Sequence, residues 1–227
     1  MSKMTENIKK DGTKGSWRWG VLLFTILLLI DMVTKMVADA YFSLPDTPDR
    51  VTIIPGWIYL CITYNPGIAY GIGGGAPTWA KLSVIAGTGI LMLILALVFF
   101  KIDKRRMWIR VALVFIVAGG VGNLIDRVYY RVWDSTAPFG VRDMVDLSRF
   151  GFAVCNFADF FITGGAVALV VALVFFDSEA IFPMGKYKKM AEEIEIRELE
   201  KQAQKQAKKQ AKKESARNAA RTEQKNG

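Results

Sequence analysis

The sequence of 227 residues contains no histidine. That absence excludes a catalytic triad built on histidine, a zinc site of the H-E-x-x-H type and any proton shuttle that uses an imidazole. Cysteine is almost as scarce. Cys61 and Cys155 are too few and too far apart for a C-x-x-C metal or redox motif. The sequence leaves two roles open for them, as small apolar packing residues or as the partners of one disulfide.

Charged and apolar residues occupy different parts of the chain. The hydrophobic fraction is 52%, although the formal net charge is +9. In a soluble protein this combination would suggest a nucleic-acid binder. Here the cations lie in the termini and in one short loop, whereas four long apolar blocks carry few charges. We therefore expect a membrane protein, with membrane lipids around it and no nucleic-acid partner.

The four apolar blocks have the length of membrane-spanning helices. A helix needs about 20 apolar residues to cross the hydrocarbon core of a bilayer. The sequence predicts an α-helical integral membrane protein whose transmembrane domain covers residues 17–178, between an N-terminal segment (1–16) and a basic tail (179–227). The predicted spans are residues 17–38, 82–100, 107–127 and 159–177.

The positions of lysine and arginine predict the orientation of these spans. Cations concentrate before the first span, in the turn "KIDKRRMWIR" and in the tail, whereas residues 40–78 and 128–157 contain few. Cytoplasmic segments are enriched in Lys and Arg. Both termini should therefore be cytoplasmic, and the two cation-poor connections should face outward. The alternative is a signal peptide cleaved at "ADA" (38–40), but Asp31 and Lys35 interrupt the preceding apolar run.

Two segments outside the spans have local structure of their own. The stretch "RVTIIPGWIYLCITYN" is rich in β-branched and aromatic residues, which predicts a short strand pair or small sheet on the outer membrane surface. The tail is rich in Ala, Lys, Gln and Glu, which favour helix. It is compatible with a solvated, partly frayed helix or with a basic helix held at anionic headgroups.

Polar side chains near the outer ends of the spans are candidates for function, because ionisable groups within spans are rare. Asp31 and Lys35 are four residues apart and share a helical face, as an ion pair that fixes the helix or as a headgroup contact. In "YNPGIAYG", Asn65 and Gly67 belong either to an ordinary surface turn or to a loop that hydrogen-bonds an extended peptide.

The third span ends in "GGVGNLIDR" (119–127). Its glycines allow another helix to approach closely. Asn123 and Arg127 share one face of this helix. They are compatible with a packing helix that ends in an interfacial anchor, or with a binding site.

The stretch "VRDMVDLSRFGFAVCNFADFF" contains Asp143, Asp146 and Asp159. Two carboxylates within hydrogen-bond distance share one proton, so that one can act as a base and the other as an acid. Such a pair requires no His, Ser, Cys or metal. Asp159 lies at the mouth of the fourth span, where a helix cap is the structural alternative. Spacing alone leaves Asp143 and Asp146 as equal candidates for its partner.

In their order along the chain, these motifs resemble the bacterial lipoprotein signal peptidases (signal peptidase II). The resemblance covers residues 17–178. The chain departs from the family pattern in Tyr70, where Phe is common, in a longer link at 128–140 and in the basic tail. The matching motifs are D-x-x-T-K (31–35), N-P-G-x-A-F/Y (65–70), G-N-x-I-D-R (122–127), V-x-D-F/M (141–144) and F/C-N-x-A-D (155–159).

The resemblance implies an intramembrane aspartic endopeptidase of the bacterial cytoplasmic (inner) membrane. Such an enzyme removes the signal peptide from a diacylglyceryl-modified prolipoprotein before the lipidated cysteine, at the extracytoplasmic face, with no metal or cofactor. It implies Asp143 and Asp159 as the catalytic pair and a loop or helix at 128–140 that covers the substrate. We expect a monomer. The implied supporting residues are Asp31, Lys35, Asn65, Gly67, Asn123, Arg127 and Asn156.

Two other functions fit a membrane protein with buried charges. A small ion or proton transporter also carries intramembrane carboxylates, but transporters usually place them near the midplane and often contain internal repeats. Here the charges lie toward one face and the sequence shows no repeat. A non-catalytic scaffold that recruits a partner through its tail would leave the outer Asp and Asn residues unexplained.

Overall fold

The computed structural model describes residues 17–67, 75–104, 106–134, 140–177 and 180–223. The predicted N-terminal segment 1–16, residues 68–70 of the N-P-G motif and residues 135–139 of the longer link lie outside the described residues. The chain divides into two compact units, residues 1–170 and 171–227. Each unit is described by itself.

Within the described residues, four helices are long and apolar enough to cross a membrane, which confirms the predicted number. Their bounds differ from the expected spans by a few residues. α2 continues to Phe42 and α3 begins at Thr78, because a helix can extend past the hydrocarbon core wherever its backbone remains hydrogen-bonded. The helices are α2 (Arg18–Phe42), α3 (Thr78–Lys101), α4 (Met107–Tyr129) and α5 (Phe157–Phe175).

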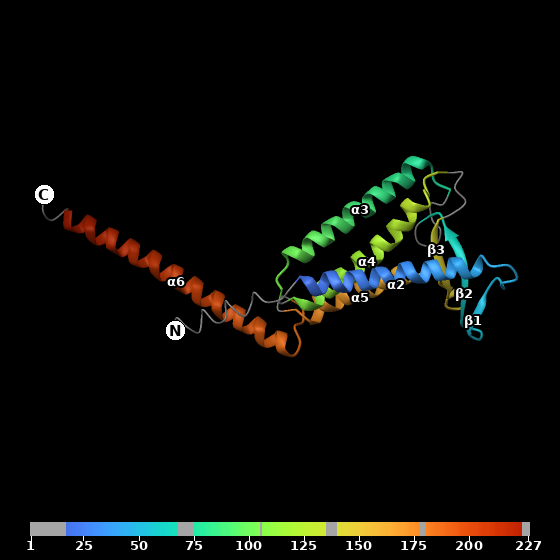
Figure 1. Cartoon of the computed structure of the whole chain (residues 1–227). Coiled ribbons are helices and arrows are strands. Elements are labelled where there is room, and N and C mark those ends of the chain that lie inside the picture. The colour runs from blue at the N-terminus through green and yellow to red at the C-terminus, as the bar shows by residue number, and fades with distance from the viewer. Residues whose placement is uncertain (1–16, 68–74, 105, 135–139, 178–179, 224–227) are drawn as a thin grey trace. The chain divides into compact units, whose positions relative to one another are not determined.

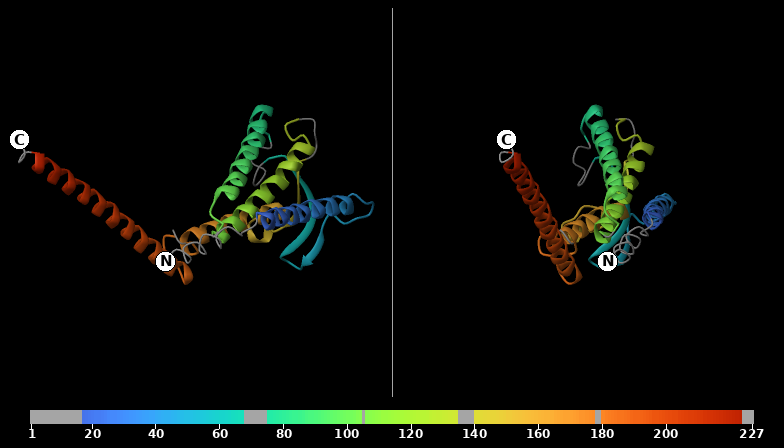
Figure 2. Two further views of the ribbon diagram at one scale, coloured as in Figure 1. Left: turned by 60° about the vertical axis from the view of Figure 1, so that its left-hand side comes forward. Right: turned by 90° about the vertical axis from the view of Figure 1, so that its left-hand side faces the viewer.

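Helix α4 is the centre of the bundle. Both α2 and α3 pack against it, and Figures 1 and 2 show it between them. Each glycine of "GGVG" meets a different neighbour. A Cβ atom on Gly119 would lie 2.3 Å from the Ala158 carbonyl oxygen, one on Gly120 would meet Met92 of α3, and one on Gly122 would meet Asp31 of α2. The predicted close approach therefore occurs on three sides of one helix turn.

A three-stranded antiparallel sheet lies at one end of the bundle (Figure 1). β1 (Val51–Ile54) and β2 (Ile58–Asn65) form the predicted hairpin through Gly56, whose φ of 80° requires the left-handed conformation. β3 (Val141–Asp146) pairs with β2, so that Thr63 lies opposite Asp143. β2 and β3 contact α2, and β3 also contacts α4.

The third strand corrects the sequence analysis, which assigned residues 141–146 to an outer loop. Three of its six residues are Arg or Asp, a composition that disfavours an isolated strand. Its partner β2 is more than 70 residues upstream, so no hairpin signal marks the pairing. Of the link 128–140, the described residues comprise the last turn of α4, a turn at 130–134 and Gly140, with no covering helix among them.

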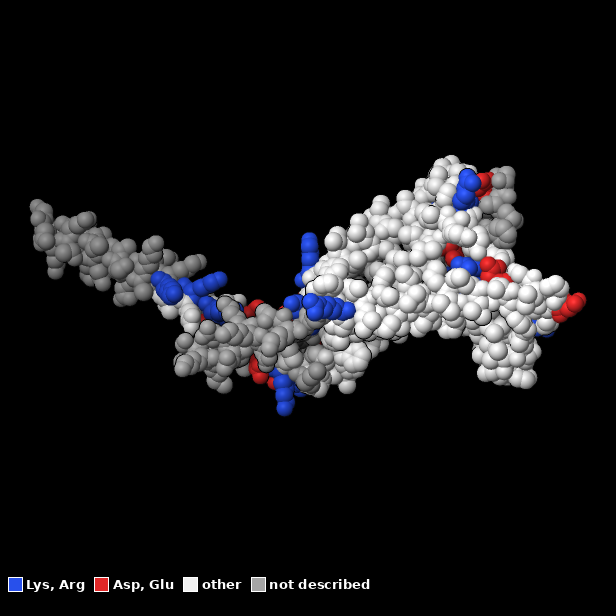
Figure 3. Space-filling view, in the orientation of Figure 1, with Lys and Arg blue, Asp and Glu red and all other residues white. Residues whose placement is uncertain are grey.

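Charged side chains are sparse over the helices. On the face in Figure 3, the described Lys, Arg, Asp and Glu residues lie toward the two ends, and the surface between them is uncharged. Large apolar side chains are exposed along these helices, including Leu22, Ile90 and Leu93. An apolar girdle of this kind suits contact with lipid rather than water.

The second unit contains the last turn of α5 and helix α6 (Lys186–Glu223). The chain folds back on α5 before α6 begins: Phe182 and Met184 donate backbone hydrogen bonds to the carbonyl oxygens of Val174 and Phe175, at 2.8 and 3.0 Å. The described side chains of α6 beyond Ala191 are exposed. In the first turn Tyr187 is buried and its ring lies 6.5 Å from that of Phe176, so only the start of α6 adds apolar packing among the described residues.

Candidate active site

A cavity of about 550 Å³ lies where α4, α5, β2 and β3 meet. Its volume is within the range of small-ligand sites. Six of the sixteen lining residues carry a charge, an amide or a thiol, and most of the others are apolar. The cavity brings together residues that the sequence places in four separate motifs. The polar ones are Asn65, Asn123, Arg127, Asp143, Cys155 and Asp159.

Asp143 enters this cavity from β3, and its residue is only 4% exposed. Its two oxygens accept hydrogen bonds from amide groups, one from Asn156 Nδ2 at 2.6 Å and one from Asn65 Nδ2 at 3.2 Å. Burial, followed by the nearby Asp159 charge, raises the pKa of Asp143 to about 7. Near neutral pH this carboxyl group can therefore hold or release a proton.

Asp159 lies in the first turn of α5 and takes part in a reciprocal cap. Asn156 Oδ1 accepts from the Asp159 backbone N–H at 3.1 Å, and Asp159 Oδ2 accepts from the Asn156 N–H at 3.0 Å. The cap explains why α5 begins at Phe157, two residues before the predicted start. The other oxygen of the Asp159 side chain, Oδ1, accepts a hydrogen bond from Asn123 Nδ2 at 2.8 Å. Asp159 thus caps the helix and also presents a carboxylate to the cavity.

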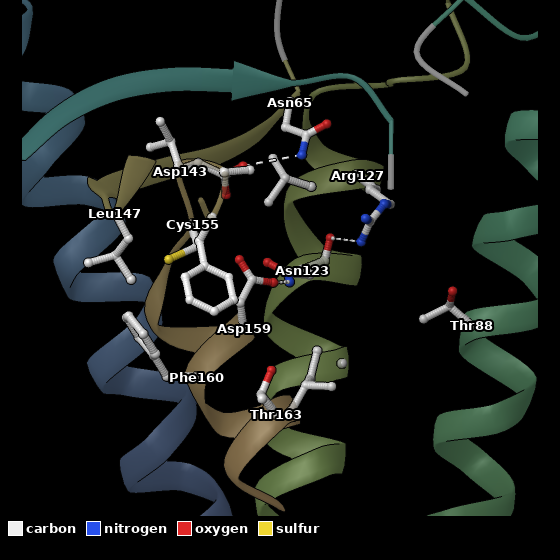
Figure 4. Close-up of a pocket in the computed structure, with 16 residues that line it drawn as sticks. Asn65, Thr88, Asn123, Arg127, Asp143, Leu147, Cys155, Asp159, Phe160 and Thr163 are labelled. Carbon is white, nitrogen blue, oxygen red and sulfur yellow. Dashed lines mark hydrogen bonds between the residues drawn. The ribbon is translucent and has the colours of Figure 1, made fainter. Parts of the chain in front are cut away.

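Figure 4 shows both carboxylates directed into the same cavity, one from the strand and one from the helix. Asn156 joins them, because its amide nitrogen donates to Asp143 Oδ1 and also to Asn123 Oδ1, at 3.1 Å. Asn123 in turn donates to Asp159. Within the described residues, the hydrogen bonds to the two side chains come from neutral groups, and no cation is bonded directly to either carboxylate.

Lys35 contacts Asn123 and is fully buried. Its ammonium donates to Asp31 Oδ2 at 2.8 Å and to Asn123 Oδ1 at 3.0 Å, and lies 3.5 Å from Asp126 Oδ2. The second oxygen of Asp31 accepts from the Ala158 backbone N–H at 2.9 Å. The predicted i, i+4 pair is therefore present, and it connects α2 to both α4 and the start of α5.

Arg127 lines the cavity and contacts Gly67, which follows β2. Arg127 Nη2 donates to the Gly67 carbonyl oxygen and Nη1 to the Asn123 carbonyl oxygen, both at 3.2 Å. The Gly67 N–H donates to Asn65 Oδ1 at 3.0 Å, which forms a turn closed by the Asn side chain. The arginine therefore holds the described part of the N-P-G loop against α4.

Asp146 lies elsewhere. In a strand, residues three apart point to opposite faces, so Asp146 cannot share the orientation of Asp143. Its Oδ1 accepts from the Ser148 backbone N–H at 2.9 Å, and hydrogen bonds from the side chain and the backbone of Ser148 lower the pKa of Asp146. Asp146 therefore caps the turn that follows β3.

The sequence analysis gave no role to Arg142. Its guanidinium contacts Asp126 at 2.7 Å and 3.4 Å, its backbone N–H donates to the same carboxylate at 3.1 Å, and it lies 3.9 Å from Asp39. Asp39 also accepts from the hydroxyls of Tyr64 and Tyr130. These contacts fix β3 to α2 and α4. In the sequence, the contact between Asp126 and Arg142 was indicated only by two charged residues within otherwise apolar stretches.

Cys155 lines the cavity but is a poor nucleophile. Burial, with additional effects from Asp159 and Asp143, raises the pKa of its thiol to about 12, and the thiolate is the reactive form. Both cysteines are free thiols in the structure. Among the residues that the structure describes, no group of three His, Cys, Asp or Glu side chains could hold a metal ion.

Comparison with known proteins agrees with the resemblance seen in the sequence. The family model of signal peptidase (SPase) II matches residues 23–175. A lipoprotein signal peptidase of Fusobacterium nucleatum is 30% identical over 177 residues, which are 78% of this chain and 96% of that relative. Another, from Microcystis aeruginosa, is 31% identical over 160 residues, which are 70% and 92% of the two chains.

A solved structure is similar as well. A bacterial membrane enzyme determined by the in meso method at 2.3 Å resolution is 27% identical, with a TM-score of 0.56 over 68% of this chain and 86% of that one. The chain therefore belongs to the signal peptidase II (lipoprotein signal peptidase) family, whose members are membrane-spanning aspartic peptidases.

Proposed function

We propose that Asp143 and Asp159 form the catalytic dyad of this peptidase. The observation that carries the proposal is their convergence: one carboxylate from β3 and one from α5 enter the same cavity and are linked through Asn156 and Asn123. In this proposal the two carboxyl groups share a single proton, because two carboxylates in one site do not both ionise readily.

The proposed chemistry is general acid–base hydrolysis. The ionised carboxylate takes a proton from a water molecule, whose oxygen attacks the scissile carbonyl carbon, while the protonated carboxyl gives its proton to the carbonyl oxygen. The tetrahedral intermediate then collapses. Its hydroxyl returns a proton to the pair, the amide nitrogen receives one, and the C–N bond breaks. The dyad ends with one proton, as it began.

The supporting residues have distinct proposed roles. Asn65 and Asn156 orient Asp143, and Asn123 orients Asp159. Lys35, held by Asp31, fixes Asn123. Arg127 and the Gly67 carbonyl hold the rim, where an extended peptide backbone would bind. Each role rests on the hydrogen bonds given above.

We further propose that the substrate is a diacylglyceryl-modified prolipoprotein, cut before the lipidated cysteine. The mixed cavity supports this substrate, because polar groups face the peptide bond while Phe160, Ile162 and Phe152 provide an apolar wall for lipid chains. All residues of the dyad and its amide network come from one chain, which is compatible with a monomeric enzyme.

The proposed membrane is the bacterial cytoplasmic membrane, with the sheet and the dyad on the extracytoplasmic side. The cation-rich turn between α3 and α4 supports this orientation. Single cysteines placed at Thr52 of β1 and Glu200 of α6 in a variant without native cysteines test it in intact cells. A membrane-impermeant thiol reagent should modify position 52 and not position 200, and the reverse pattern would contradict the orientation.

The substrate proposal is tested with purified enzyme in detergent and two forms of one prolipoprotein, with and without the diacylglyceryl group. Mass spectrometry should find cleavage of the lipidated form only, directly before the modified cysteine. Equal cleavage of both forms, or cleavage at another bond, would contradict the proposed specificity without contradicting the dyad.

A further inference from the structure

A second cavity, of about 370 Å³, lies between α2, α3 and α4. It shares no lining residue with the cavity that holds the two carboxylates. All of its lining residues are glycine or apolar, and they include Phe24, Met92 and Phe99. Since α2 and α3 both pack on α4, the cavity is a groove with α4 as its floor.

The floor of this groove is a single stripe of α4. Leu113, Val117, Val121 and Leu124 follow one another at steps of four, four and three residues. At a rise of about 1.5 Å per residue, the stripe is about 17 Å long. That length is close to half of the roughly 30 Å hydrocarbon core, which is the depth of one leaflet. The groove therefore has the shape of a site for one acyl chain.

Arg110 continues the same stripe, three residues before Leu113 and toward the turn between α3 and α4. Only 2% of the residue is exposed, and its Nε and Nη1 atoms are buried without a hydrogen-bond partner among the described residues. Its guanidinium lies 4.5 Å from the ring centroid of Phe99, which also lines the groove, and 5.3 Å from that of Trp19.

A buried guanidinium with unused donors is unfavourable unless an anion compensates it. Stacking on two aromatic rings offsets only part of that cost. Phosphate suits such a group, because the N–H donors of a guanidinium form strong, charge-assisted hydrogen bonds with phosphate oxygens. Lys101, exposed at the end of α3, adds positive charge at the same end of the bundle.

From the groove and this arginine together, we infer a binding site for one anionic glycerophospholipid. Its phosphate pairs with Arg110, and one acyl chain occupies the groove between α2 and α3. Arg110 lies toward the end of α4 opposite to the carboxylates, and the groove shares no lining residue with their cavity, so the site is separate from that of the lipid-modified substrate. The inference does not depend on the proposed chemistry.

The test uses the full chain, freed of lipid in detergent, with native mass spectrometry to count bound lipid and thermal unfolding to follow stabilisation. Phosphatidylglycerol, phosphatidylcholine and inorganic phosphate are the probes. We expect one tightly bound phosphatidylglycerol, weaker binding of phosphatidylcholine and no stabilisation by inorganic phosphate at the same concentration. Equal stabilisation by inorganic phosphate would overturn the lipid site in favour of a simple anion site.

Two variants examine the two halves of the site. Arg110→Met keeps an unbranched chain without the charge, and should weaken phosphatidylglycerol binding roughly tenfold or more, as loss of a charge-assisted hydrogen bond does. Gly89→Leu fills the groove, since a Cβ there meets only Leu124, at 3.7 Å. It should weaken binding of both lipids.

Gly87→Leu is the matched control on the same helix, because a Cβ there meets nothing within 4 Å. It should bind lipid as the parent does. Prolipoprotein cleavage serves as the folding check for every variant. Unchanged phosphatidylglycerol binding by a folded Arg110→Met protein overturns the proposal. If that variant does not fold, equal binding by Gly89→Leu and Gly87→Leu overturns it instead.

Discussion

Two asparagine side chains, Asn65 and Asn123, each direct an amide nitrogen toward one of the two carboxylates. An amide has one accepting oxygen and one donating nitrogen, so a contact on one side fixes the direction of the other. Asn123 Oδ1 accepts from Lys35, which leaves its nitrogen facing Asp159. Asn65 Oδ1 accepts from the Gly67 N–H, which leaves its nitrogen facing Asp143. The groups that donate to these amide oxygens thus determine which nitrogen donors face the two carboxylates.

The raised pKa of Asp143 predicts a pH dependence of stability. Burial and the Asp159 charge raise this pKa from 3.8 to about 7, so between these values the folded protein holds a proton that the unfolded chain has lost. The contribution of this group to stability therefore falls as pH rises from about 4 to about 7, and stays low above that range. Asp143→Asn removes this dependence.

Thermal unfolding in detergent between pH 5 and pH 8 provides the measurement. The unfolding temperature of the parent should fall relative to that of Asp143→Asn as pH rises. A rise of the parent relative to the variant over this range would contradict the assigned direction. Asp146→Asn serves as the control, because its carboxylate has a lowered pKa and lies outside the cavity.

Removal of the Lys35 charge should destabilise the protein. Lys35→Met leaves two fully buried carboxylates, Asp31 and Asp126, without their shared ammonium. Loss of one partner of a buried ion pair costs about 3–5 kcal/mol. We expect a loss of this size in chemical denaturation, and slower cleavage as Asn123 loses its orientation.

Lys101→Met is the surface control, with an expected change within about 0.5 kcal/mol. The double variant Asp31→Asn/Lys35→Met should recover part of the loss, because one uncompensated carboxylate is removed. Equal stability of Lys35→Met and the parent would show that this buried cluster does not hold the bundle together.

At the scale of residues, the sequence predicted contacts between side chains of the same helix. Asp31 and Lys35 are four residues apart, and periodicity alone predicts that they pair. The contact between Asp126 and Arg142 could not be predicted in that way. It joins a helix to a strand that the sequence did not reveal, and Arg142 points away from Asp143, which follows it in β3.

At the scale of elements, the packing of α4 against α5 positions Asp159. Two adjacent glycines of α5 provide a comparison. A Cβ on Gly165 would lie 2.8 Å from Ile116 Cγ1 and 2.9 Å from the Ala112 carbonyl oxygen, whereas a Cβ on Gly164 would meet nothing within 4 Å. The Ala112 oxygen belongs to the backbone of α4 and cannot move independently of its helix.

Gly165→Ala should therefore force the two helices apart and destabilise the protein by about 1–3 kcal/mol. Gly164→Ala has the same change in helix propensity and should be neutral or slightly stabilising. Thermal unfolding and the cleavage rate measure both effects. Equal behaviour of the two variants would contradict the close approach of α4 and α5.

The elements differed in how well the sequence predicted them. The spans were predictable because length and hydrophobicity are local properties. The β1–β2 hairpin was also predictable, because β-branched residues flank a Pro-Gly turn. β3 was not, because its strand character comes from pairing with β2 and from contacts with α2 and α4. Non-local pairing of this kind leaves no periodic signal in six residues.

At the scale of the whole molecule, the proposed catalytic residues and the basic tail lie in different compact units. Every residue of the proposed active site precedes Val170, and the tail from Lys186 contributes exposed helix. We propose that the tail is a separable cytoplasmic segment. A chain truncated before Lys186 should cleave prolipoprotein within about twofold of the parent rate, since no described contact of the dyad is lost.

The truncated chain must first be shown to fold, by a single elution peak and an unfolding temperature close to that of the parent. A large loss of turnover in a truncated protein that meets both conditions would contradict the separation. Lipid vesicle binding by the tail peptide alone would distinguish a helix held at anionic headgroups from a solvated one.

The most direct test of the central claim is the rate at which the aspartate variants cleave diacylglyceryl-modified prolipoprotein under single-turnover conditions. Asp143→Asn and Asp159→Asn should each lose at least about a thousandfold, because neither can share the proton that the reaction requires. Asp146→Asn should retain a rate close to that of the parent. Substantial cleavage by a folded Asp159→Asn variant would contradict the dyad. If Asp143→Asn kept the parent cleavage rate and Asp146→Asn lost it, the choice of Asp143 as the partner of Asp159 would be contradicted.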